Sequence, residues 1–127
     1  LRLSQVVNER NRILKLYKDQ LRNTPIQFLE IPSICLSAVH LAVIMLHQCK
    51  SNMQSYLYHK LKENYVGTQV HYLPVHLQPY YRKLGFNEGD FPESENFSRS
   101  VLSIPLFPGL TDEQVVRVSQ LIKMHIN

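Results

Sequence analysis

Apolar residues recur every three or four positions over the first two dozen residues, which predicts an amphipathic helix. Pro25 disfavours a helical conformation at the residue before it, so this helix should end near residues 23–25. No capping residue precedes the pattern, which suggests a chain cut inside a longer helix. The apolar stripe consists of Leu3, Val6, Val7, Leu14, Tyr17 and Leu21.

Three later segments have the lengths and patterns of strands. Residues 39–47 are an almost continuous apolar run rich in β-branched residues, as in a central strand. Residues 68–73 alternate between two faces, and residues 101–106 form a third strand in which Pro105 marks the end. Residues 25–36 contain two prolines and are expected to form an extended linker.

Helix signals separate and follow these strands. Two short helices are expected over residues 79–84, with Gly85 as the stop, and over residues 93–98, with acids in the first turn. Two further helices should begin at capping boxes, in which each residue caps a backbone N–H of the other. These boxes pair Ser51 with Gln54 and Thr111 with Gln114.

The predicted fold is α+β: a small three-stranded antiparallel sheet packed with helices and preceded by the long amphipathic helix. Composition agrees with one core, since the chain has 127 residues of which 44% are hydrophobic. The longest apolar stretch, residues 38–46, is about half of what a membrane crossing needs. The net charge of +4 is mild and dispersed, which argues against nucleic-acid binding. Two cysteines and no visible signal peptide favour reduced thiols and a cytoplasmic location.

Polar side chains cluster after the second predicted strand. His71 and Tyr72 leave the sheet on opposite faces, and a bend at Pro74 should bring His76 and Gln78 back near the same place. Imidazole, phenol and amide groups suit sugar hydroxyls or phosphates. Alternatively, these groups could bond one another and the loop carbonyls.

Residues 70–85 carry a family resemblance: they read Val-His-Tyr-Leu-Pro-Val-His-Leu-Gln-Pro-Tyr-Tyr-Arg-Lys-Leu-Gly. This block resembles the His-Tyr-x-Pro-x-His-x-Gln-Pro signature of the DegT/DnrJ/EryC1/StrS sugar aminotransferases. Gly-Asp-Phe-Pro-Glu-Ser-Glu at 89–95, Ser-Ile-Pro-Leu-Phe-Pro-Gly-Leu-Thr at 103–111 and Ser-Ala-Val-His-Leu at 37–41 resemble further family motifs in the same order. Residues 70–92 most resemble the pseudaminic-acid pathway branch.

The resemblance implies the C-terminal small domain of a fold-type-I aminotransferase. Residues 1–24 would be the linking helix from a large domain, and residues 25–127 the small domain itself. The implied reaction transfers an amino group, from a donor such as glutamate, to C4 of a UDP-linked keto sugar for surface glycan biosynthesis. The small domain would form part of the sugar-nucleotide cleft. The substrate-binding positions carried over are His71, Tyr72, His76, Gln78, Tyr80 and Tyr81.

The implied cofactor is pyridoxal phosphate (PLP), which a lysine of the large domain would hold as a Schiff base. We expect this chain alone to hold no cofactor, to supply no catalytic residue and to be inactive. Its lysines lie in charged helical or turn stretches without a phosphate-binding context: Lys15, Lys18, Lys50, Lys60, Lys62, Lys83 and Lys123.

The sequence is also compatible with other hypotheses. The chain could be a stand-alone, non-catalytic binding domain of aminotransferase ancestry, and the first helix could pair two copies into a homodimer. The family commonly has glycine where Tyr65 stands, so we expect Asn64 to take the left-handed conformation instead. A metal site is a less favoured hypothesis, with candidate ligands Cys35, His40, His47, Cys49, His71 and His76.

Overall fold

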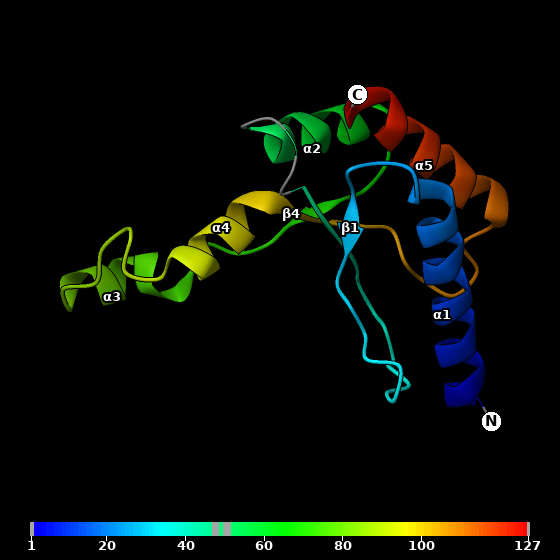
Figure 1. Ribbon diagram of the computed structural model, residues 1–127, viewed down its shortest axis with the longest axis horizontal. Coiled ribbons are helices and arrows are strands. Elements are labelled where there is room, and N and C mark those ends of the chain that lie inside the picture. The colour runs from blue at the N-terminus through cyan, green and yellow to red at the C-terminus, as the bar shows by residue number, and fades with distance from the viewer. Residues whose placement is uncertain (1, 47–48, 50–51, 127) are drawn as a thin grey trace.

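A computed structural model describes residues 2–46, 49 and 52–126 and shows an α+β architecture (Figure 1). The described residues contain five α-helices, a short 3-10 helix (η1) and a four-stranded sheet. In chain order the elements are α1 (Arg2–Leu21), β1 (Gln27–Phe28), β2 (Ala42–Met45), α2 (Met53–Glu63), β3 (Gln69–Val70), η1 (Val75–Leu77), α3 (Pro79–Lys83), α4 (Pro92–Ser100), β4 (Val101–Ile104) and α5 (Asp112–Ile126).

The sheet has the strand order β1-β2-β4-β3, and every pairing is antiparallel. The prediction of an antiparallel sheet is therefore confirmed, but the prediction of three strands is wrong. The additional strand, β1, lies within residues 25–36, which were expected to be a linker. Its two residues are too few to show a period-two pattern, so only the pairing of Phe28 with Ile44 reveals it.

The core lies between the sheet and three helices, α1, α2 and α5. The α1 and α5 helices run side by side (Figure 1), and Ile13, Tyr17 and Leu21 of α1 are buried in the shared core. The first helix thus covers the domain of its own chain, while Leu3 near its start remains exposed. The homodimer through this helix stays a prediction. No described helix is long and apolar enough to cross a membrane.

The helix caps agree with the sequence in one place and differ in another. At α5 the Thr111 N–H donates to Gln114 Oε1 (3.0 Å) and the Gln114 N–H donates to Thr111 Oγ1 (3.3 Å), which confirms that capping box. At α2 the cap is Asn52, with a φ of 66°, and Gln54 instead donates to the carbonyls of Ser98 (2.8 Å) and Val101 (2.5 Å). Ser51 lies outside the described residues.

The end of α2 differs from the prediction for Asn64. Tyr65 has a φ of 58° and is the left-handed residue, whereas Asn64 has a φ of −95°. The Tyr65 N–H donates to the Lys62 carbonyl (3.0 Å), and the Val66 N–H donates to the Leu61 carbonyl (2.9 Å). This is a Schellman motif in which buried Val66 packs with the helix end, so two hydrogen bonds and a core contact hold the tyrosine in a glycine conformation.

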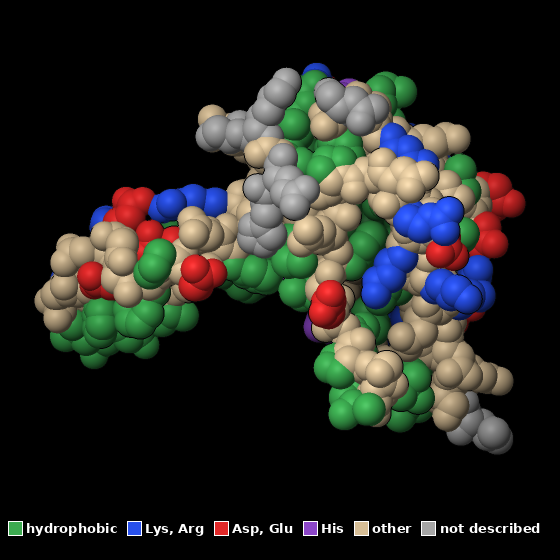
Figure 2. Space-filling model, viewed as in Figure 1, with side chains coloured by type: hydrophobic (Ala, Val, Ile, Leu, Met, Phe, Trp, Pro, Cys, Tyr) green, Lys and Arg blue, Asp and Glu red, His purple; other side chains and the backbone are tan. Residues whose placement is uncertain are grey.

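Residues 75–91, which we call the arm, project from the sheet beyond α4, on the side away from α1 and α5 (Figure 1). Every residue from 79 to 91 is exposed. Hydrophobic side chains gather on one side of the arm and charged side chains on the other (Figure 2). The large apolar side chains exposed on this segment are Val75, Tyr80, Tyr81, Leu84, Phe86 and Phe91.

Candidate functional site

His71 follows β3 and lies beside the central strand β4. Its Nε2 is 3.0 Å from Ser103 Oγ, and its ring lies edge-on to Phe97, 6.2 Å between centroids. Because Ser103 is buried on β4, the hydroxyl holds the imidazole in a defined orientation.

The ring of His71 lines a pocket of about 380 Å³, which we call the hairpin pocket. The segment joining β1 to β2 forms much of its wall, and a second imidazole, His40, belongs to that segment. The volume is in the range of small-molecule sites. Other residues of its lining are mainly apolar: Phe28, Ile31, Val39 and Leu41.

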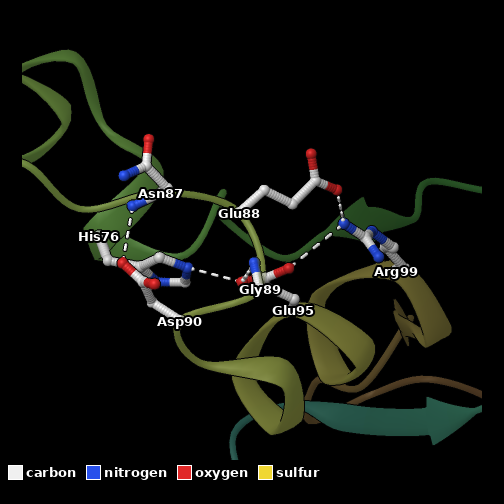
Figure 3. A network of polar contacts seen from close by, with 7 residues as sticks. All are labelled: His76, Asn87, Glu88, Gly89, Asp90, Glu95 and Arg99. Atoms are coloured by element: carbon white, nitrogen blue, oxygen red, sulfur yellow. Dashed lines mark hydrogen bonds and ion pairs between the residues drawn. The ribbon is translucent and has the colours of Figure 1, made fainter.

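His76 occupies a different environment, because η1 carries it away from β4 and toward α4. The residue is 7% exposed, and its Nε2 is 2.9 Å from Oε1 of Glu95, a residue that is 3% exposed (Figure 3). The same carboxylate oxygen accepts the Gly89 N–H at 2.8 Å. The hydrogen bond from His76, followed by that from Gly89, lowers the pKa of Glu95.

Further polar contacts join the C-terminal end of the arm to α4 (Figure 3). Arg99 forms an ion pair with Glu88 of the arm and lies 3.5 Å from the second oxygen of Glu95. We call this set, His76, Glu88, Gly89, Glu95 and Arg99, the latch. It ties both ends of the arm to a single helix.

A second pocket, of about 340 Å³, lies on the arm and is called the arm pocket. One edge of His76 lines it, and aromatic rings form most of the rest. The lining residues are Val75, His76, Tyr81, Phe86, Phe91 and Ser94.

The predicted site residues are therefore divided rather than gathered. His71 lines the hairpin pocket, whereas His76 and Tyr81 line the arm pocket. Tyr72 is 83% exposed, and Tyr80 packs edge-on against Tyr81 at 5.3 Å. The Gln78 side chain donates to the Leu73 carbonyl at 3.4 Å, within the loop itself.

Sequence reasoning missed the residues that position the two histidines. Glu95 was noted for its place in the first turn of α4 and in the motif at 89–95, and Ser103 as part of a strand and of the motif at 103–111, but neither was expected to contact a histidine. Each lies far along the chain from its histidine, 19 residues for Glu95 and 32 for Ser103. The feature that distinguishes Glu95 is its burial, which is unusual for a glutamate in the first turn of a short helix. A single sequence does not reveal burial, so this feature could not be used.

The described lysines do not fit the role that PLP requires. All six are exposed or half-exposed on helices, and the hydrogen bond that Lys60 donates to Glu63 raises the pKa of Lys60. A Schiff-base lysine needs a neutral amine in an enclosed site. Likewise, no three His, Cys, Asp or Glu residues of the described chain lie close enough together to hold a metal ion, and the candidate His47 lies outside it.

Comparison with known proteins identifies a family whose sequence profile matches this chain. The profile of the DegT/DnrJ/EryC1/StrS aminotransferase family matches residues 1–123. The spore coat polysaccharide biosynthesis protein SpsC of Bacillus subtilis is 38% identical over 89 residues, which are 68% of this chain and 23% of that protein.

Two solved structures share the fold. A protein of Streptococcus pneumoniae described as a sugar aminotransferase, solved in its PLP form, superposes with a TM-score of 0.88 and 22% identity, over 97% of this chain and 32% of the other. PseC of Helicobacter pylori, an aminotransferase of pseudaminic-acid biosynthesis, gives 0.75 and 21%, over 97% and 33%. The chain thus spans no more than a third of the length of these proteins.

Proposed function

Because the chain belongs to the DegT/DnrJ/EryC1/StrS aminotransferase family, we propose that it is the C-terminal part of a PLP-dependent sugar aminotransferase. The proposed reaction transfers an amino group from glutamate to C4 of a UDP-linked keto sugar for the biosynthesis of a surface glycan. The similarity to SpsC supports the link to polysaccharide biosynthesis. The amino-acid sequence of residues 70–92 supports the pseudaminic-acid branch of the family, whereas the structural similarity to PseC supports the fold alone.

The role proposed for this chain is to form one wall of the sugar-nucleotide cleft at the hairpin pocket. The observation that carries this proposal is the position of His71, which Ser103 orients at the edge of a pocket of about 380 Å³. An oriented imidazole can donate to or accept from a sugar hydroxyl. The apolar residues around it exclude water and so strengthen that hydrogen bond.

PLP, when bound to the complete enzyme, supplies the electron sink for amino transfer. Since the described lysines do not fit its attachment, no reaction step is assigned to this chain. Its residues bind and orient the sugar, and they shield one side of it from solvent.

The test is kinetic and uses the complete enzyme. We expect His71→Ala to raise the KM for the nucleotide sugar roughly 2- to 10-fold, the effect of losing one hydrogen bond, with a smaller change in kcat. The matched control is His59→Ala, because His59 is an exposed histidine of α2 outside both pockets. Unchanged kinetic constants in His71→Ala would show that His71 has only a structural role.

A further inference from the structure

The arm pocket has no role in the cleft described above, yet its lining is more aromatic than that of the hairpin pocket. We propose that it binds the nucleobase of the nucleotide sugar. This inference rests on the proposed function, because it assigns a second part of the same substrate to a second pocket.

The chemistry of the lining favours a flat, uncharged ring. The rings form a continuous series, with centroid distances of 4.8 Å from His76 to Phe91, 6.1 Å from Phe91 to Phe86 and 6.4 Å from Phe86 to Tyr81. Aromatic side chains of this kind stack on any nucleobase, because every base has a π face. Three lining residues carry polar side-chain groups that can bond a base edge: Ser94, Tyr81 and His76.

The distribution of charge excludes the phosphates from this pocket. No lysine, arginine, aspartate or glutamate lines it, and the charged side chains of the arm gather on the opposite side (Figure 2). A diphosphate placed here would lose its hydration without gaining a cation. The base is the part of a nucleotide sugar that can be buried against aromatic rings without that cost.

The latch makes the pocket a preformed one. The arm has no core of its own, since residues 79–91 are all exposed, so its geometry depends on the buried contact of His76 with Glu95 and on the Gly89 and Glu88 contacts. A wall fixed before binding loses little conformational entropy when a ligand enters.

The spacing of the two pockets suits one extended ligand. His71 in the hairpin pocket and His76 in the arm pocket are five positions apart in the chain, so their Cα atoms lie at most about 18 Å apart. A sugar at His71 and a base on the arm are therefore within the reach of one nucleotide sugar.

The experiment measures binding of uridine diphosphate (UDP) to the purified chain by calorimetry. Saturation-transfer NMR identifies the ligand protons that contact the protein. We expect UDP to bind with saturation of its uracil protons, and Phe86→Ala to weaken this binding roughly 10-fold, the effect of losing one base–aromatic stack. The matched control is Phe107→Ala, because Phe107 is 49% exposed, comparable with 37% for Phe86, and lies outside the arm pocket.

Each outcome bears on the proposal. Equal UDP affinity of Phe86→Ala and the unmodified chain overturns the base assignment, as does an absence of UDP binding. The chain could instead dimerise through the arm. If Phe86→Ala makes such a dimer monomeric without changing UDP affinity, the arm is a self-association surface and the base assignment is overturned. The cleft proposal is judged separately: His71→Ala in the complete enzyme can fail to raise the KM whether or not the base lies on the arm.

Discussion

Replacing Tyr65 by glycine should stabilise the domain, which is unusual for a substitution that removes an aromatic ring. Tyr65 holds a φ of 58°, and its side chain is 96% exposed, so almost no burial is lost. The left-handed conformation costs a residue with a Cβ about 1–2 kcal/mol, and glycine avoids this cost. Glycine in turn loses roughly 0.5–1 kcal/mol more conformational freedom on folding. The expected gain in the free energy of unfolding is therefore about 0.5–1 kcal/mol.

The assay is thermal unfolding followed by circular dichroism, together with urea denaturation. Unfolding entropy near 2.1 cal/mol/K per residue makes a gain of this size a rise in Tm of about 2–4 °C for a chain of 127 residues. The matched control is Tyr72→Gly, another exposed tyrosine, but one without a positive φ, which should lower stability. A lower Tm for Tyr65→Gly would refute the reasoning, since it would mean that the tyrosine ring contributes more than the strain costs.

Two further predictions concern buried polar groups. The Tyr17 hydroxyl is buried without a hydrogen-bond partner among the described residues, so Tyr17→Phe should raise the free energy of unfolding by about 1 kcal/mol in urea denaturation, and a decrease would contradict this. The pKa of Glu95 is lowered in the folded chain, so its contribution to the latch is present above its ordinary value of 4.5 and is lost as pH falls through the folded value. Hydrogen exchange of residues 79–91 should therefore rise in acid in the unmodified chain, beyond the intrinsic pH effect, and Glu95→Gln should abolish that pH dependence. Equal pH dependence in both proteins would exclude the carboxylate as its source.

Much of the fold could be predicted because local chemistry determines it. The apolar stripe of α1, the capping box of α5 and the glycine after α3 are signals within a few residues of each other, and all three elements form where expected. The capping box expected between Ser51 and Gln54 involves a residue outside those described, and the Gln54 side-chain amide donates to the distant carbonyls of Ser98 and Val101, which local sequence does not reveal. The strand β1 was not predicted because two residues are too few to show the alternating pattern of a strand.

The candidate site was only half predictable for the same reason. Residue type and spacing identified His71 and His76 as polar groups near a strand end. Which pocket each one lines depends on contacts with Ser103 and Glu95, which α4 and β4 bring from more distant parts of the chain. The proline bend was expected to bring the two imidazoles together, whereas the 3-10 turn after Pro74 separates them.

The central position of β4 has a consequence for how the chain is made. Strands β2 and β3 both pair with β4 and not with each other, although β4 is the last of the four described strands to leave the ribosome. Until residues 101–104 emerge, the nascent chain exposes two unsatisfied strand edges, one of them on the apolar segment 42–45. The sheet can close only when this late segment inserts between its neighbours, so a ribosome that stalls before residue 101 would hold an aggregation-prone intermediate.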